Sequence, residues 1–146
     1  MRVLLQRVKK SSVEVDGDLI ANIGNGVLVF IGIEKNDTKK IATKMIDKIL
    51  NYRIFKDEND KMNLSIKDIA GEVLTVSQFT LAADTKSGTR AGFSTAMPPN
   101  LAQKLYNYFV ENIHQKHQKT KFGIFGADMQ ISLVNDGPIS FILEIN

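Results

Sequence analysis

The stretch Val73-Leu74-Thr75-Val76-Ser77-Gln78-Phe79-Thr80-Leu81 decides the fold. Its first four residues are apolar or β-branched, which is typical of a strand that is buried on both faces. The strand then ends in hydroxyl groups and an amide, so polar side chains and free backbone N–H groups collect there. Open α/β sheets bind ligands at the ends of such strands. The stretch therefore predicts a central strand of an α/β sheet with a binding site at its end.

A second strand end of this kind lies close to the end of the sequence. Residues 131–134 read Ile-Ser-Leu-Val and run into Asn135-Asp136-Gly137-Pro138-Ile139-Ser140. The Asp-Gly-Pro combination is typical of a tight turn. We therefore expect a strand over residues 129–134, a turn at residues 136–138 and a last strand over residues 139–145.

The remaining elements follow from the spacing of apolar residues. A helical stripe at Ile41, Met45 and Ile49 predicts one helix, and Pro98-Pro99 begins a second. Asp16-Gly17 predicts a hairpin turn, and Gly24-Asn25-Gly26 predicts another hairpin turn. The other predicted strands cover residues 3–5 and 13–15 as a first pair, then 19–23, 27–33 and 53–55. Residues 1–146 are thus predicted to form a single α/β domain with two principal helices.

Residues 82–97 have no clean periodicity and contain Gly88 and Gly92. Connections of this length are longer than usual and are commonly functional or mobile.

The composition limits the class of protein. Hydrophobic residues make up 43% of the chain and charged residues 24%, which is ordinary for a globular domain. No apolar run approaches the roughly 20 residues of a membrane span, and charges interrupt the N-terminus too early for a secretory signal. Cysteine is absent, which excludes disulfides and thiolate sites. We expect a cytoplasmic protein with no membrane association.

Three lysines form a regular pattern in the first predicted helix. Lys40, Lys44 and Lys48 are four residues apart, so on a helix they form one stripe. The formal net charge is +3, which permits contact with a polyanion without requiring it. Spacing alone favours a solvated face over a binding surface.

The sequence offers few groups for acid–base catalysis. Its two histidines, His114 and His117, stand in a Gln- and Lys-rich stretch, where a solvated helix end is favoured over a zinc site. Gly24-Asn25-Gly26 lacks the Gly-Lys-Ser/Thr of a phosphate-binding loop. We expect no metal and no cofactor. Any catalysis must then depend on backbone groups, hydroxyl groups or the substrate itself.

The two strand-end motifs resemble the signatures of the D-aminoacyl-tRNA deacylase (D-tyrosyl-tRNA deacylase) family. Residues 77–81 resemble its first signature. Residues 135–140 resemble its second, Asn-x-Gly-Pro-Val-Thr, with Ile139 and Ser140 in place of Val and Thr. Other stretches that agree in order and spacing are Gln6-Arg7-Val8, Arg53-Ile54-Phe55, Lys61-Met62-Asn63-Leu64-Ser65, Leu105-Tyr106 and Phe125-Gly126-Ala127-Asp128-Met129. The resemblance spans nearly the whole chain.

The resemblance implies a hydrolase that cleaves the ester of D-aminoacyl-tRNA, and of glycine mischarged on tRNA, at the 3′-terminal adenosine. It also implies a three-layer α/β/β fold with mixed sheets and a homodimer that proofreads chirality. An aminoacyl ester is already activated, and the neighbouring ribose 2′-OH can orient or activate water. The protein then has only to position the ester and stabilise the oxyanion.

The resemblance also implies roles for individual residues. The backbone of Phe79 and Thr80 binds the ester or the oxyanion, while Ser77 and Gln78 shape the adenosine side. The Thr80 hydroxyl is the candidate nucleophile, but a covalent role is the weaker interpretation because no base is in view. The alternative is that Thr80 simply terminates a strand.

For chiral selection the resemblance points to Gly137 and Pro138, joined by a cis peptide that enters the partner subunit's pocket and excludes L side chains. The alternative is a tight turn with trans proline. Arg7 is expected to hold this segment by hydrogen bonds. The alternative is that Arg7 is a solvent-exposed arginine at a strand edge. Phe125 and Met129 are expected to line the site, with core packing as the rival interpretation.

Two other classes of function stay open at this stage. One is a non-catalytic tRNA- or nucleotide-binding homodimeric module that uses the same strand-end pocket and the lysines. The other is a homodimeric interaction module in which the Gly-Pro turn completes an interface.

Overall fold

The computed structural model describes residues 1–146. The strands are β1 (Arg2–Val15), β2 (Asp18–Ile23), β3 (Gly26–Gly32), β4 (Phe55–Lys56), β5 (Met62–Leu64), β6 (Glu72–Ser77), β7 (Thr120–Phe122) and β8 (Gln130–Glu144). The helices are α1 (Lys39–Asn51), the short 3-10 helix η1 (Phe79–Ala82) and α2 (Pro99–Lys116). Neither α-helix combines the length and the hydropathy that a membrane span requires.

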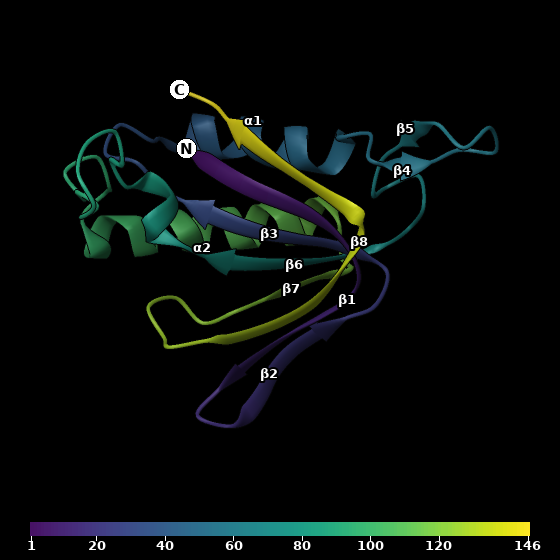
Figure 1. Ribbon diagram of the computed structural model, residues 1–146, viewed down its shortest axis with the longest axis horizontal. Helices are drawn as coiled ribbons and strands as arrows, with labels where there is room; N and C mark the ends of the chain where they lie inside the picture. Colours follow the sequence, from purple (N-terminus) through teal and green to yellow (C-terminus); the bar gives the residue numbers. More distant parts are fainter.

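Six strands form one mixed sheet. Their order is β2-β1-β3-β6-β7, and β8 pairs with β1 as well (Figure 1). β3, β6 and β7 run parallel, whereas β1 is antiparallel to β2, β3 and β8. Because β3 and β6 are parallel neighbours, their C-terminal ends meet at one edge of the sheet. The polar residues that end β6 therefore lie beside the end of β3.

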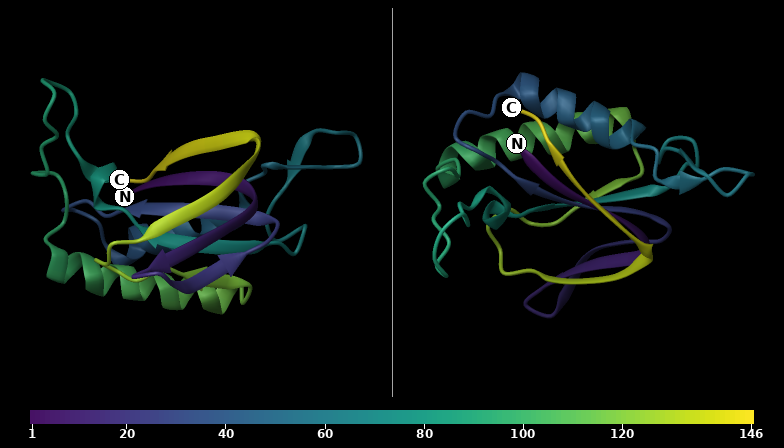
Figure 2. Two further views of the ribbon diagram at one scale, coloured as in Figure 1. Left: turned by 60° about the horizontal axis from the view of Figure 1, so that its bottom comes forward. Right: turned by 45° about the horizontal axis from the view of Figure 1, so that its top comes forward.

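The elements stack in three layers, which Figure 2 shows from the side. Helices α1 and α2 cover one face of the central strands, where Met45, Ile46 and Phe109 belong to the larger core. The second half of β1, together with β2 and the first part of β8, curls under the other face. There Val13 and Leu74 belong to a second, smaller core. The predicted α/β/β arrangement is confirmed.

Both predicted helices are present, and the predicted hairpin at Asp16-Gly17 joins β1 to β2. Both turn residues have positive φ angles, 51° and 84°, as a tight hairpin of this kind requires. Thr38 caps α1, because its side chain accepts a hydrogen bond from the Ile41 N–H at 3.3 Å.

Two predicted strand arrangements are wrong. Residues 3–5 and 13–15 are not a pair of strands but parts of the single long strand β1. The turn at residues 24–26 does not close a hairpin, because β3 pairs with β1 rather than with β2. Alternating apolar residues identify a strand but not its length or its partner.

The predicted turn at residues 136–138 is also different in the structure. β8 is continuous through this segment and pairs with β1 on both sides of it, with register shifts between Gln6 and Val8 and between Val8 and Lys10. Gly137 has a φ of 124°, and the Gly137–Pro138 peptide is cis. The Gly-Pro motif is therefore a bulge within a long strand rather than a link between two strands.

Candidate active site

A cleft of about 800 Å³ opens at the C-terminal ends of β3 and β6. Most of the residues that line it are apolar, and Asp128 is the only one with an ionisable side chain. The lining residues are Ile31, Ile33, Val76, Ser77, Gln78, Phe79, Phe93, Ala96, Met97, Pro98, Pro99, Ala102, Phe125, Gly126, Ala127, Asp128, Met129 and Ile131. The predicted binding site at the end of β6 thus coincides with a cleft of a size that suits a small molecule.

The floor of the cleft is the junction between β6 and η1. The Gln78 N–H donates to the Ile31 carbonyl at 2.8 Å, which fixes the end of β6 against β3. η1 then begins at Phe79. The first N–H groups of a helical turn have no hydrogen-bond acceptor inside the turn. The N–H groups of Phe79 and Thr80, at the start of η1, therefore have no acceptor within η1. The backbone can therefore offer donors at the position that the sequence predicted.

Gly32 explains why η1 sits so close to β3. A Cβ atom at this position would lie 2.7 Å from Leu81 Cβ and 3.2 Å from the backbone nitrogen of Ala82. Any side chain on Gly32 would push η1 away from the sheet, because neither of these atoms can move alone. The absence of a Cβ atom at Gly32 thus allows η1 to pack closely against β3 at the base of the cleft.

Thr80 itself lies outside the cleft lining. Its residue is exposed, and its hydroxyl oxygen accepts a hydrogen bond from Gln78 Nε2. The two histidines are also absent from the cleft. His117 contacts the Gly71 carbonyl through Nε2, and His114 packs edge-on against the ring of Phe122. Neither histidine can act as a base toward Thr80.

The loop formed by residues 83–98 makes one wall of the cleft. Its last part is tied to the segment after β3, because Lys35 N–H donates to the Thr95 carbonyl and Met97 N–H donates to the Ile33 carbonyl, each at 3.0 Å. Thr95 Oγ1 also donates to the Ala82 carbonyl. On the open side, the rings of Phe79 and Phe93 lie 5.1 Å apart.

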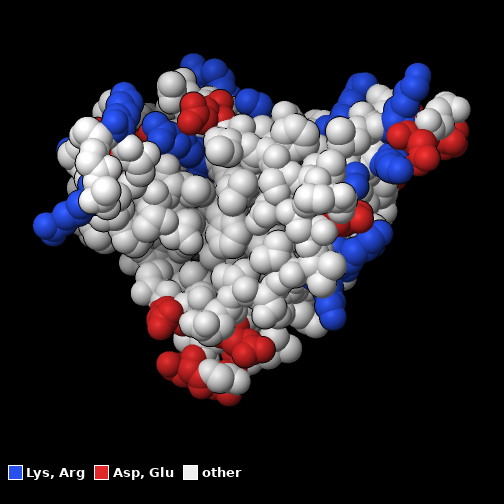
Figure 3. Space-filling view, viewed as in Figure 1, with Lys and Arg blue, Asp and Glu red and all other residues white.

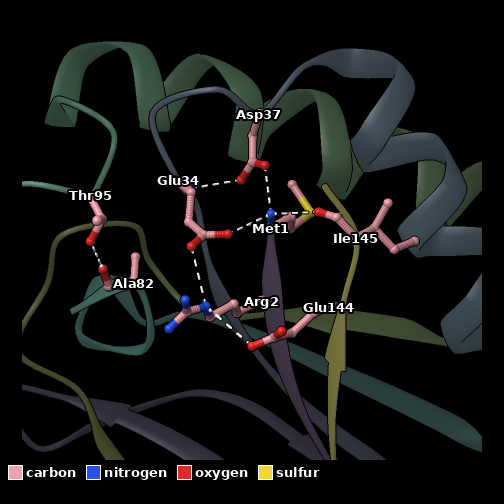
Figure 4. Close-up of polar contacts among 8 residues, drawn as sticks. All are labelled: Met1, Arg2, Glu34, Asp37, Ala82, Thr95, Glu144 and Ile145. Carbon is pink, nitrogen blue, oxygen red and sulfur yellow. Dashed lines mark hydrogen bonds and ion pairs between the residues drawn. The ribbon is translucent and has the colours of Figure 1, made fainter. Parts of the chain in front are cut away.

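The segment that holds this wall is anchored by the amino group of Met1 (Figure 4). The ammonium is fully buried and donates to Asp37 Oδ1 at 2.6 Å, to Glu34 Oε2 at 2.9 Å and to the Ile145 carbonyl at 2.8 Å. Asp37 Oδ2 in turn accepts from the Glu34 N–H. Sequence reasoning missed this cluster, because nothing in the sequence brings residue 1 to residues 34 and 37.

Phe125 and Met129 line the opposite wall, as the sequence predicted for both. The ring of Phe125 packs on Tyr106 at 5.6 Å between centroids. Tyr106 is buried and its hydroxyl donates to the Thr75 carbonyl at 3.3 Å. Burial raises the pKa of Tyr106 to about 12. Sequence reasoning also missed Asp128, although it lies between the two predicted wall residues.

The cis-proline loop, residues 135–140, is held by side chains on both sides. Arg7 is buried, not solvated: its Nη1 donates to the Ile54 carbonyl at 2.6 Å, and its Nε lies 3.2 Å from both the Asp136 carbonyl and Asp136 Oδ2. Asn135 Oδ1 accepts from the Ile139 N–H at 3.0 Å. Ser140 Oγ accepts from both Asn135 Nδ2 and Gln6 Nε2. Gly137 and Pro138 stay exposed.

The structure does not bring the cis-proline loop to the cleft of the same chain. The loop lies opposite Arg7, which pairs with Val27 near the start of β3, whereas the cleft begins at Ile31. Four residues of strand separate these positions, or about 13 Å. No residue of the cis-proline loop lines the cleft. Within one chain the two predicted halves of the site are separate.

Comparison with known proteins shows the family of the chain. The family model described as D-Tyr-tRNA(Tyr) deacylase matches residues 4–144. The chain therefore belongs to this family of hydrolases.

Individual relatives match over their whole length. The D-aminoacyl-tRNA deacylase of Pseudoalteromonas translucida (strain TAC 125) is 54% identical over 145 residues, which cover 99% of this chain and 100% of the relative. A solved structure named c-Myc DNA Unwinding Element Binding Protein superposes with a TM-score of 0.96 at 41% identity and covers 100% of this chain and 99% of its own. A probable eukaryotic D-amino acid tRNA deacylase shares the fold at 17% identity, with a TM-score of 0.86 and coverage of 99% and 98%.

Proposed function

We propose that this protein hydrolyses the ester bond of D-aminoacyl-tRNA and releases the free D-amino acid and tRNA. The observation that carries the proposal is the cleft itself. It lies at the end of a parallel strand pair, is lined by Phe79, the first residue of η1, and contains one ionisable side chain. Such a cleft suits a substrate that is already activated and carries its own group to assist hydrolysis. An aminoacyl ester with an adjacent ribose 2′-OH is a substrate of this kind.

The proposed chemistry needs little from side chains. Water attacks the ester carbonyl, and the N–H groups of Phe79 and Thr80 stabilise the negative charge that develops on its oxygen. The carbon–oxygen bond to the ribose then breaks, and the 3′-oxygen leaves with a proton. Ser77 and Gln78 flank the adenosine, and the aromatic rings of Phe79 and Phe125 hold the substrate in position.

Chiral selection, in this proposal, comes from a second copy of the chain. The cis-proline loop is exposed and about 13 Å along β3 from its own cleft, so it can act only on the cleft of a partner. Carbonyl oxygens of Gly137 and Pro138 would then occupy the space that an L side chain requires. Glycine has no side chain to exclude, so glycyl-tRNA is a second expected substrate.

The test of the proposed function is release of amino acid from matched D-tyrosyl-, L-tyrosyl- and glycyl-tRNA by the purified protein. We expect rapid loss of the D and glycyl esters, with the L ester spared. Equal hydrolysis of the D and L esters would contradict chiral exclusion. No hydrolysis of any ester would contradict the enzymatic proposal.

Replacement of the Thr80 side chain separates the two possible roles of this residue. In Thr80→Ala the N–H is kept and the hydroxyl is lost, so we expect kcat/KM to fall by less than about fivefold, because no base is available to activate the hydroxyl. A fall on the order of 1000-fold would instead support a covalent nucleophile. Thr80→Ser is the matched control, because it keeps the hydroxyl that accepts from Gln78 Nε2 and loses only the methyl group.

A second candidate function is binding of nucleic acid without hydrolysis. The name of the structure at 41% identity describes a protein that binds a DNA element. This alternative predicts that the protein binds tRNA and leaves all three esters intact. The ester-release assay therefore decides between the two candidates.

A further inference from the structure

The outward face of α1 carries three lysines that have no acidic partner. Lys40, Lys44 and Lys48, here called the lysine stripe, are all exposed, whereas the opposite face of α1 is buried on the sheet. None of the three forms an ion pair with an acid. Like charges four residues apart destabilise a helix slightly. The stripe is thus a positive surface that the fold itself does not use.

The acids of α1 and of the segment directly before it are already engaged. Asp47, the one acidic residue of α1, forms an ion pair with Lys116 of α2. Before the helix, Asp37 and Glu34 take up the Met1 ammonium, and Glu34 also contacts Arg2. The positive charge of the stripe therefore remains unbalanced.

Figure 3 shows the charged side chains on one face of the molecule. Basic side chains follow the upper edge, at the level of α1 in Figure 1, with some acidic groups among them, whereas the lower tip formed by β1 and β2 carries acidic side chains alone. The residues between these two strands include Asp16, and β2 itself starts with Asp18. A polyanion would be attracted to the α1 edge and repelled from the opposite tip.

The stripe leads directly to the cleft. The segment between β3 and α1 is hydrogen-bonded to the loop that walls the cleft, through Lys35 to Thr95 and Met97 to Ile33. From there α1 runs along the face of the sheet for about 20 Å, and successive lysines of the stripe are about 6 Å apart along its axis. A chain of phosphates that enters the cleft with its last nucleoside can lie along this row.

We propose that the lysine stripe binds phosphates of the tRNA strand whose 3′-terminal adenosine occupies the cleft. This inference rests on the proposed function for the nature of the bound strand. Contacts to phosphates position a nucleic acid without reading its sequence. The stripe then raises affinity for any tRNA that carries the ester, and it contributes nothing to the choice between D and L residues.

The test compares two triple variants of equal charge. Lys40→Gln/Lys44→Gln/Lys48→Gln removes the stripe. Lys10→Gln/Lys61→Gln/Lys67→Gln removes three exposed lysines that also lack acidic partners and lie outside α1. Both variants should fold, because exposed substitutions away from the core and the caps change stability little. Each is assayed on D-tyrosyl-tRNA and on D-tyrosyl-adenosine, which has the same ester but no phosphates.

For the stripe variant we expect KM for D-tyrosyl-tRNA to rise at least about tenfold and the slope of log(kcat/KM) against log[salt] to fall by about 2 to 3. Its kcat, and its activity on D-tyrosyl-adenosine, should change by less than about twofold because no phosphate is involved. The control variant should resemble the unmodified protein.

Equal effects in the two variants, or an unchanged KM and salt slope in the stripe variant, would overturn the proposal. An unchanged KM and salt slope would indicate that the lysine stripe binds an acidic protein partner instead of tRNA. Failure of the unmodified protein to hydrolyse any ester would contradict the proposed function instead. The stripe would then be tested by binding of uncharged tRNA, which must weaken in the stripe variant and not in the control.

Discussion

The cleft and the cis-proline loop are built in opposite ways. The cleft is concave and mostly apolar, and η1 begins at one of its lining residues, Phe79. The cis-proline loop is exposed, yet Arg7, Gln6, Asn135 and Ser140 hold it through side-chain hydrogen bonds. Surface loops are usually more mobile than the elements they connect, and these hydrogen bonds restrain the cis-proline loop.

The difference suggests a division of labour between binding and exclusion. A cleft that accepts many side chains can be apolar and permissive. A group that excludes one enantiomer must keep its shape when it is pressed against a ligand, so it must be rigid before contact. The predictions below disturb one region at a time and are arranged from the largest expected effect on turnover to the smallest.

Gly137→Ala should have the largest effect. A Cβ here would lie 2.8 Å from Ile139 Cγ1 and 3.1 Å from Arg7 Nη2, at a φ of 124° that an L residue rarely adopts. We expect the loop to shift by about 1 Å and kcat/KM for D-tyrosyl-tRNA to fall about 100-fold. Gly17→Ala is the control for backbone strain alone, because its φ is also positive but nothing lies within 4 Å of its Cβ. Unchanged turnover and chirality would contradict the assigned role of Gly137.

Gly32→Ala disturbs the cleft and leaves the cis-proline loop unchanged. The added methyl group would displace η1, so we expect kcat/KM to fall about tenfold and the free energy of unfolding to fall by about 1–3 kcal/mol. Steady-state kinetics and urea unfolding measure the two effects. Gly92→Ala, in the neighbouring loop, is the matched control, because its nearest contact would be at an ordinary 3.9 Å. A variant with normal kinetics would show that the position of η1 does not matter for turnover.

Arg7→Lys keeps the charge behind the cis-proline loop but not the geometry. A lysine cannot reach the Ile54 carbonyl and the Asp136 oxygens together, so one buried group loses its partner. We expect a loss of about 1–3 kcal/mol in the free energy of unfolding, with discrimination between D and L esters reduced severalfold. Lys9→Gln is the control, since Lys9 contacts Asp136 from an exposed position. If both variants behave alike, burial of Arg7 is not what holds the loop.

Tyr106→Phe should leave turnover nearly unchanged and alter only stability at high pH. Burial raises the pKa of Tyr106 from 10.0 to about 12, so its contribution to stability is complete below pH 10 and is lost as the pH rises toward 12. The loss amounts to about 2–3 kcal/mol. Urea unfolding of both proteins at pH 8, 10 and 11.5 measures the difference. The phenylalanine variant should lose less stability over this interval, and parallel profiles would contradict the assignment.

The sequence predicted the elements of this fold better than their connections. The buried strand at residues 73–76, the two helices and the hairpin at Asp16-Gly17 were predicted from local patterns, and the structure contains them. Pairing of β1 with three other strands depends on contacts between distant residues, which no local pattern records. The Gly137-Pro138 bulge was predicted as a turn for the same reason: only the β1 partner on both sides makes the strand continuous.

The parts of the site were predicted unevenly. Ser77 and Gln78 line the cleft, as the first strand-end motif indicated, and so do Phe125 and Met129, as the family resemblance indicated. The wall formed by residues 83–98 could not be predicted in detail, because it has no periodicity. The support of that wall by the Met1 ammonium was equally hidden, since it joins residues that are distant in the sequence.

That buried ammonium gives the protein a built-in reporter. Amine-reactive reagents label exposed lysines at once, but the Met1 amino group has no solvent-accessible surface. It becomes reactive only when the ends of β1 and β8 separate from the Glu34–Asp37 segment. The rate at which mass spectrometry detects a label on residue 1 would therefore measure how often the structure opens beside the cleft, without any introduced probe.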